Sequence, residues 1–160
     1  MLVIADSSPL IVLLDIDHVG ILPGLFGQVA IPPEVAAELG RSSRSQIVRE
    51  FVAGRPSWLS VRSPTVIEAI PALHAGERAA LSLARELRAD LLLIDEARGR
   101  RAAAERRIPF TGTIGVIEVA AERGLLDLKE AFERVKRTDF WISQDLLDER
   151  LKLYLSRKSS

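Results

Sequence analysis

The sequence LVIADSSPLIVLL, residues 2–14, decides the fold class of this chain. Its first four residues form a continuous apolar run that ends at Asp6, a pattern typical of a strand buried on both faces of a parallel sheet. Ser8 and Pro9 follow, a helix-capping residue and a proline suited to the first helical turn, and an apolar helical segment comes next at residues 10–14. The stretch therefore predicts a buried strand, a turn at an aspartate and a helix.

The same pattern returns at residues 91–94, LLLI, which precede Asp95 and an alanine-containing helix at residues 96–107. Further strands are expected at 28–31, at 58–61 on an edge and at 108–111 in the core, and further helices at 32–39, 45–52, 76–88, 113–123, 128–136 and 144–155. Strands that alternate with helices predict an α/β fold of three layers, α/β/α, with a central, mostly parallel sheet. Ligands bind beyond the carboxyl ends of such strands, where Asp6 and Asp95 stand.

The chain has 160 residues, of which 48% are hydrophobic and 28% charged, enough for one domain with a substantial core. We expect a single domain over residues 1–155 and a frayed tail over residues 156–160. No apolar run approaches the length of a membrane span and the first residues make a poor signal peptide, so we expect a cytoplasmic protein without membrane contact. Cysteine is absent, which excludes disulfides, thiolate zinc sites and cysteine nucleophiles.

Charge is sorted along the chain although its sum is zero. The 22 Lys and Arg residues equal the 22 Asp and Glu residues, a balance that argues against binding nucleic acid by bulk charge alone. Residues 1–40 contain no Lys or Arg, whereas five arginines fall within residues 98–107. Because His18 and His74 are the only histidines in the sequence, a metal site would consist of oxygen ligands, which suit Mg²⁺ or Mn²⁺ better than Zn²⁺.

Four acidic residues occupy positions from which they can meet at one edge of the sheet: Asp6, Glu38, Glu77 and Asp95. Both aspartates follow apolar strands, while Glu77 lies on the sheet-facing side of its helix and Glu38 borders the buried face of a short helix. Converging carboxylates repel one another, and a divalent cation removes that cost and activates water for phosphodiester hydrolysis. Each acid also has a structural interpretation, the aspartates as helix caps and Glu77 as an acid that stabilises a helix N-terminus.

Weaker candidates surround these acids. Arg98, like Arg100 and Arg101, follows Asp95 on the next helix and can reach a substrate phosphate, although a solvated helix face explains it equally well. Ser7 and Thr113 are weak candidates for contact with phosphate or substrate.

The aromatic residues are scattered along the chain: Trp58, Phe132, Phe140 and Trp141. We expect them to fill the core or an interface, because a base-stacking platform needs aromatic rings grouped on one surface. The last helix, at 144–155, carries more leucine than a peripheral tail needs, so it packs either on the body of the domain or on another chain.

Five stretches of the sequence together resemble one family: VIADSSPLI at 3–11, IPPEVAAELG at 31–40, HAGERAALSLARE at 74–86, LLLIDEARGRRAA at 91–103 and IPFTGTIGVIEVA at 108–120. In order and spacing they are similar to the PIN domain, in particular to its prokaryotic subgroup of VapC-like toxins. The resemblance implies a metal-dependent endoribonuclease, the toxin of a type II toxin–antitoxin pair. It implies RNA as the substrate, Mg²⁺ (or Mn²⁺) as the cofactor, and an antitoxin protein and a second copy of the chain as partners. It assigns the catalytic and metal-binding roles to Asp6, Glu38, Glu77 and Asp95.

The sequence departs from the family pattern in two places. Many PIN domains have an aspartate where Glu77 stands and a further acid after the fourth ligand, a place that Glu96 either fills or leaves to solvent. The later TGTIG offers the hydroxyls of Thr111 and Thr113 where a carboxylate is expected. One bound ion or two are therefore both compatible with the sequence.

Two other function classes are open to such a chain. A PIN-like module without catalysis, serving RNA binding or assembly, would keep its acids as caps and surface charge, and would bind no divalent cation at them. A phosphoacceptor of the receiver type also has aspartates at strand ends, but it needs a lysine late in the sheet. No lysine occurs before Lys129, so we discount this third interpretation.

Overall fold

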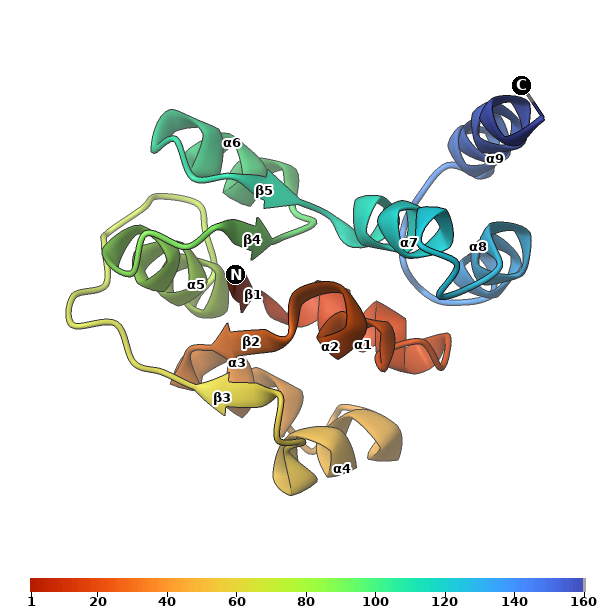
Figure 1. Cartoon of the computed structure of the whole chain (residues 1–160). Helices are drawn as coiled ribbons and strands as arrows, with labels where there is room; N and C mark the ends of the chain where they lie inside the picture. The colour runs from red at the N-terminus through yellow and green to blue at the C-terminus, as the bar shows by residue number, and fades with distance from the viewer. Residues whose placement is uncertain (160) are drawn as a thin grey trace.

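The computed structural model describes residues 1–159, in which five strands form one sheet covered by helices on both faces (Figure 1). The strands are β1 (Leu2–Ala5), β2 (Gln28–Ile31), β3 (Leu59–Val61), β4 (Leu91–Leu93) and β5 (Phe110–Thr111). Their order in the sheet is β3-β2-β1-β4-β5, and every neighbouring pair is parallel. The predicted three-layer α/β/α fold is confirmed, with a sheet that is parallel throughout.

The helices follow the strands along the chain. They are α1 (Ser7–Asp15), α2 (Ile21–Phe26), α3 (Pro33–Leu39), α4 (Gln46–Gly54), α5 (Ala75–Glu86), α6 (Ala97–Glu105), α7 (Thr113–Glu122), α8 (Leu128–Lys136) and α9 (Gln144–Lys158). Figure 1 shows α5 and α6 on one side of the stacked strands and α1, α2, α7 and α8 on the other.

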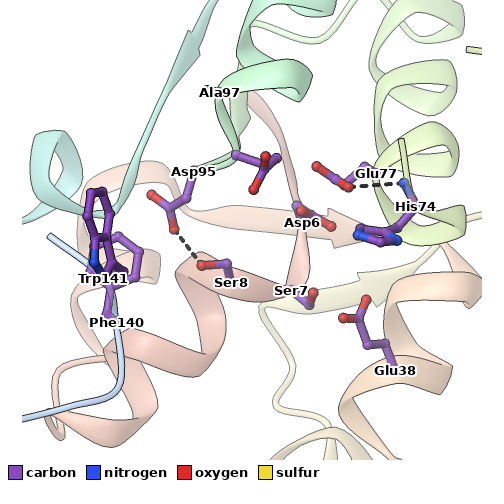
Figure 2. Close-up of a pocket in the computed structure, with 11 residues that line it drawn as sticks. Asp6, Ser7, Ser8, Glu38, His74, Glu77, Asp95, Ala97, Phe140 and Trp141 are labelled. Carbon is purple, nitrogen blue, oxygen red and sulfur yellow. Dashed lines mark hydrogen bonds between the residues drawn. The ribbon is translucent and has the colours of Figure 1, made fainter. Parts of the chain in front are cut away.

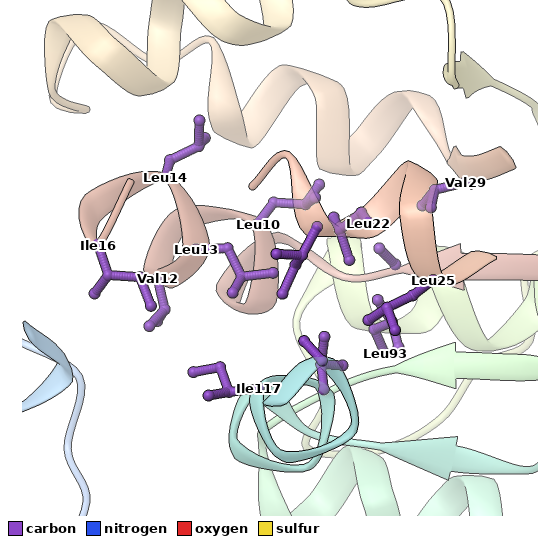
Figure 3. Close-up of a cluster of buried hydrophobic side chains, with 14 of the residues drawn as sticks. Leu10, Val12, Leu13, Leu14, Ile16, Leu22, Leu25, Val29, Leu93 and Ile117 are labelled. Atoms are coloured by element: carbon purple, nitrogen blue, oxygen red, sulfur yellow. The ribbon is translucent and has the colours of Figure 1, made fainter. Parts of the chain in front are cut away.

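Two hydrophobic cores, one on each face of the sheet, explain why the strands are continuously apolar. In β1, Val3 and Ala5 belong to the core that α1, α2, α7 and α8 cover, whereas Ile4 belongs to the core beneath α5 and α6. Figure 3 shows the first core, in which Leu13, Leu22 and other side chains from separate helices come together. Since both faces of the sheet are buried, polar and apolar residues do not alternate along β1, as expected for a parallel sheet.

Two elements near prolines differ from expectation. The strand expected in the core at 108–111 is only Phe110–Thr111 long and lies at the edge of the sheet, next to β4 alone. Pro109 has no N–H to donate to a longer ladder, which explains the shortening. Helix α2 was not predicted, because Pro23 and Gly24 interrupt its six residues with signals that favour a loop.

The end of the chain also differs from expectation. Helix α9 continues to Lys158, so residues 156–158, expected to fray, are helical, while Ser160 lies outside the described residues. Ser143 caps the start of the helix, and two basic residues in the last turn suit the negative end of the helix dipole. Within residues 1–159, no helix has both the length and the apolar character needed to span a membrane.

Candidate functional site

The carboxyl ends of β1 and β4 lie side by side at the centre of the sheet. Ala5 pairs with Leu93 in the parallel register, and the backbone N–H of Asp6 donates to the carbonyl of Leu93 at 2.9 Å. Asp6 and Asp95 therefore leave the sheet at the same edge, as the sequence predicts for residues that follow neighbouring parallel strands.

A cavity of about 560 Å³ opens at this edge of the sheet (Figure 2). Its wall consists of Asp6, Ser7 and Ser8 after β1, Glu38 from α3, His74 and Glu77 at the start of α5, Asp95, Glu96 and Ala97 after β4, and Phe140 and Trp141 between α8 and α9. The four predicted acids thus line one cavity, hereafter the acidic pocket, and Ser7 lines it with them. Arg98 and Thr113 are not part of its wall.

Asp6 carries a buried oxygen that no group among the described residues hydrogen-bonds. The residue is the N-cap of α1, but its side chain makes no capping bond, and within residues 1–159 its Oδ1 has no hydrogen-bond partner. Burial raises the pKa of Asp6 to about 7; the backbone N–H of Ser7 opposes this shift, while the charges of Glu77, Glu38 and Asp95 add to it. An unsatisfied buried carboxylate is costly, so this position suits a proton or a cation.

The two carboxylate oxygens of Glu77 have different surroundings: one is hydrogen-bonded to the backbone at the start of α5 and the other is not hydrogen-bonded within the described residues. Its Oε1 accepts the backbone N–H of His74 at 3.1 Å and so stabilises the first turn of α5. Its Oε2 is buried and finds no hydrogen-bond partner in the described part of the chain. Burial raises the pKa of Glu77, the backbone N–H of His74 lowers it, and Glu96 and Glu38 raise it. The structural interpretation of Glu77 therefore explains one oxygen and leaves the other free for a ligand.

Glu38 is shared between an arginine and the acidic pocket. Its Oε1 pairs with a guanidinium nitrogen of Arg44 at 3.1 Å. Its Oε2 lies 2.9 Å from the place that a Cβ on Gly76 would occupy, and Oδ1 of Asp6 lies 3.6 Å from that same place. The glycine leaves open a small space between two carboxylates, which a side chain at this position would fill.

Asp95 is the acid with the most hydrogen bonds in the pocket. Its Oδ1 accepts the backbone N–H of Thr113 at 2.7 Å, and its Oδ2 accepts the hydroxyls of Ser8 and Thr113, each at 2.7 Å. Asp95 therefore binds the N-terminus of α7 and not that of α6, whose N-cap is Glu96. The expectation that Asp95 caps the helix directly after it is wrong. Thr113 is fully buried and donates to Asp95, so its hydroxyl does not reach substrate.

The ligand atoms that the acidic pocket offers are carboxylate oxygens, the chemical type that suits a hard divalent cation. The free oxygens of Asp6 and Glu77 and the Glu38 oxygen beside Gly76 are carboxylate ligands of the type that Mg²⁺ and Mn²⁺ prefer. No three His, Asp or Glu side chains among residues 1–159 stand close enough together to hold a metal ion by themselves. The residues present therefore fit an ion that takes further ligands from water or from a phosphate.

Among the arginines of α6, Arg100 is the one that shares a cavity with a predicted acid, Asp95. Arg98, the predicted phosphate contact, lines a separate cavity together with Arg101 and Arg106. Arg100 lines a cavity that it shares with Asp95, and its guanidinium lies 5.4 Å from the centroid of the Phe110 ring. Residues two apart on a helix point roughly 200° apart, so only one of the two arginines can face the acids.

Trp141 does not fill the core, although the three other aromatic residues considered above pack in or against it. It is 93% exposed and forms part of the wall of the acidic pocket (Figure 2). Phe132 is fully buried and Phe140 packs against the core, as expected. Trp58 packs on the ring of Phe51 with the centroids 5.8 Å apart. Trp141 lies between two helices, where no periodic pattern indicates which side chains face solvent.

A family model described as a PIN domain matches residues 2–155 of the chain. The match includes all five strands and every residue that lines the acidic pocket. Comparisons with curated proteins and with solved structures gave no match.

Proposed function

Because this chain belongs to the PIN-domain family, whose members are typically nucleases that use divalent metal ions, we propose that it is a metal-dependent endoribonuclease of the VapC-like subgroup. The observation that carries the proposal is the pair of buried carboxylate oxygens, Asp6 Oδ1 and Glu77 Oε2, that lack a hydrogen-bond partner within the described residues. Both residues line one cavity, whose wall contains three further acids, Glu38, Asp95 and Glu96. This arrangement is costly for a protein without a ligand and useful for one that binds a cation.

The proposal assigns the catalytic and metal-binding roles to Asp6, Glu38, Glu77 and Asp95. When bound, Mg²⁺ or Mn²⁺ supplies a positive charge that acidifies a water molecule and offsets charge on the scissile phosphate. Burial keeps a proton on Asp6 near neutral pH, and the carboxylate must release this proton to serve as a ligand. Metal affinity should therefore increase as the pH rises through about 7.

Residues in and around the pocket bind the side chains of Asp95 and Glu38. Ser8 and Thr113 fix the carboxylate of Asp95 from two different elements, α1 and α7. Arg44 pairs with one oxygen of Glu38 and competes with a cation for it, while the other oxygen lies beside the gap at Gly76. Substrate phosphate can then approach from the open side of the pocket, where the hydroxyl of Ser7 offers a hydrogen bond.

Cleavage of single-stranded RNA in Mg²⁺ or Mn²⁺ tests the proposal. Asp6→Asn and Glu77→Gln each remove a free carboxylate oxygen, and we expect cleavage to fall at least about a hundredfold without a fall in the melting temperature. The matched control is Glu149→Gln, which neutralises an exposed acid on α9 that is not part of the wall of the acidic pocket. Cleavage that persists in excess chelator would contradict the proposal.

We propose further that the chain is the toxin of a type II pair, acting on cytoplasmic RNA as a homodimer that an antitoxin protein inhibits. The resemblance of its motifs to VapC-like toxins supports this role. So do three exposed leucines of α9, Leu146, Leu153 and Leu155. Growth arrest on expression, relieved by Asp6→Asn and by the protein encoded next to this chain, is the expected result, and normal growth on expression would contradict the toxin role.

A catalytically inactive PIN-like module for RNA binding or assembly is the second candidate. Two observations favour it: the ion pair between Glu38 and Arg44, and the absence of a group of three metal ligands among residues 1–159. Calorimetric titration with Mn²⁺ separates the two functions. The inactive module binds no ion at the acidic pocket, and Asp6→Asn leaves its titration unchanged.

A further inference from the structure

Trp141 lies where three cavities meet at the functional edge of the sheet. It lines the acidic pocket, a cavity toward α7 that contains Arg100, and a cavity toward α4 that contains Arg44. At 93% exposure it is the most exposed of the large hydrophobic side chains in the described chain. An indole has a large apolar face that gains free energy when a flat ligand covers it, and this indole stands beside a polar cavity.

The segment that carries Trp141 is fixed at both ends. Before it, Phe140 packs against the core, and the backbone N–H of Phe140 donates to the hydroxyl of Thr138 at 3.2 Å. After it, α9 is held against α7, where Arg150 donates to the carboxylate of Glu118 at 2.9 Å. The backbone at Trp141 is therefore held at a defined place beside the acids, so little backbone conformational entropy is lost when a ligand covers the ring.

The cavity toward α7 supplies a positive charge for such a ligand. Arg100 and Arg150 both line it, together with Asp95 and Trp141. Arg150 is committed to an ion pair with Glu118. Arg100 contacts the Phe110 ring, and within residues 1–159 its guanidinium forms neither a hydrogen bond nor an ion pair. A free guanidinium is suited to bind a phosphate group through two parallel hydrogen bonds.

We propose that Trp141 and Arg100 form a subsite for one unpaired nucleotide of the RNA substrate, next to the bond that is cut. Trp141 stacks on the base and Arg100 pairs with the adjoining phosphate, while the acidic pocket receives the scissile phosphate. The inference rests on the proposed nuclease function and adds a substrate class to it. Stacking requires a base that is not paired in a helix and tolerates any base, so the subsite selects single-stranded over double-stranded RNA.

The two tryptophans of the chain allow a direct binding test. Trp58→Phe leaves Trp141 as the only indole, and Trp141→Phe leaves Trp58, which packs on Phe51. Both changes are made in an Asp6→Asn background, which stops the proposed cleavage and removes one negative charge. A fluorescently labelled 12-mer of oligouridylate is titrated, and its anisotropy reports binding independently. We expect the emission of Trp141 to be quenched on binding and the emission of Trp58 to stay constant.

Three results of this titration would overturn the subsite. The first is bound oligouridylate that leaves Trp141 emission unchanged, and the second is no binding at all. The third is an emission of Trp141 that changes with protein concentration in the absence of RNA, because that result assigns the ring to an interface between two copies of the chain.

Steady-state kinetics of RNA cleavage distinguish a loss of substrate binding at the subsite from a loss of folded protein. We expect Trp141→Ala to raise KM for single-stranded RNA about tenfold, with kcat nearly unchanged, and Trp141→Phe to restore most of the loss. Arg100→Ala should raise KM by a similar factor. Arg101 lines a separate cavity, so Arg101→Ala should leave KM unchanged. A duplex of the same sequence should not distinguish Trp141→Ala from the wild type.

The outcomes distinguish the two proposals. If the wild type cleaves RNA and Trp141→Ala leaves KM unchanged, the subsite is wrong and the nuclease function stands. If RNA quenches Trp141 but no cleavage occurs with any divalent cation, the subsite stands and the nuclease function is wrong.

Discussion

Thr113 binds both oxygens of Asp95, through its backbone N–H to Oδ1 and through its hydroxyl to Oδ2, each at 2.7 Å. The bonds join the end of β4 to the first residue of α7, two elements that are separated by a further helix and strand. They fix the carboxylate of Asp95 in the wall of the acidic pocket from a fully buried anchor. The position of an acid in the pocket thus depends on a residue that takes no part in its wall.

Thr113→Val removes the hydroxyl bond and keeps the backbone bond. A hydrogen bond to a charged group contributes about 1.5 to 3 kcal/mol, so we expect a loss of stability of that order. We also expect kcat for RNA cleavage to fall about tenfold as Asp95 loses its fixed orientation. Thr113→Ser retains the hydroxyl and should recover both quantities. A normal kcat in Thr113→Val would contradict the positioning role.

Asp6 makes the stability of the metal-free protein depend on pH. Its pKa is about 7 in the fold against an ordinary value of 3.8, so the folded state binds the proton more tightly than the unfolded state. The resulting stabilisation is complete below about pH 4 and is lost as the pH rises through about 7, by up to about 4 kcal/mol. The raised pKa of Glu77 acts in the same direction.

Thermal melting in chelator between pH 5 and pH 8 measures this dependence. We expect the melting temperature of the wild type to fall over this range, and that of Asp6→Asn to fall less and to be higher at pH 8. Asp145→Asn, at an exposed acid of α9, should follow the wild type. If the melting temperatures of Asp6→Asn and wild type fall equally with pH, Asp6 is not the group that causes the pH dependence.

Gly76→Ala tests the space between two of the acids. Its new methyl would lie 2.9 Å from Oε2 of Glu38 and 3.6 Å from Oδ1 of Asp6, so the end of the Glu38 side chain must move. We expect Mn²⁺ affinity to fall at least about tenfold without loss of stability, because alanine favours a helix by up to about 1 kcal/mol over glycine. Gly54 in α4 has open space around it, so Gly54→Ala should leave Mn²⁺ affinity unchanged. Equal Mn²⁺ affinities for Gly76→Ala and Gly54→Ala would contradict a role of the space beside Gly76 in metal binding.

Arg44→Gln tests whether the ion pair with Glu38 competes with metal. The two side chains are partly exposed and 3.1 Å apart, so their attraction amounts to at most about 1 kcal/mol. Removing it should make Mn²⁺ binding severalfold tighter by calorimetry. Arg41→Gln, an exposed arginine at the start of the same connection, should not. Weaker Mn²⁺ binding in Arg44→Gln would show that the arginine supports the site.

The strand ends of the acidic pocket could be predicted from sequence because their signals are local. The residues before Asp6 and Asp95 are apolar without interruption, and the residues after them begin helices, so both turns can be recognised within a few positions. The convergence of Glu38 and Glu77 followed from helix periodicity together with the family resemblance. These predictions needed only the regular geometry of parallel sheets and helices.

The rest of the site depends on contacts between distant elements. Whether Asp95 caps α6 or α7 is decided by where α7 begins in space, and Thr113 is 18 positions away. Which arginine of α6 faces the acids depends on the rotation of that helix, set by the close contact of Gly99 with Ile94. The exposure of Trp141 depends on how α9 docks on α7. No local pattern in the sequence encodes these contacts.

Calorimetric titration of Mn²⁺ into the wild type and into Asp6→Asn, at pH 7 and in buffers of different ionisation enthalpy, tests the central claim most directly. The account predicts that the wild type binds Mn²⁺ and releases a proton as it does so, because burial keeps Asp6 partly protonated at this pH. It predicts that Asp6→Asn loses both the proton release and most of the affinity. No binding by the wild type, or the same titration for both proteins, would contradict it.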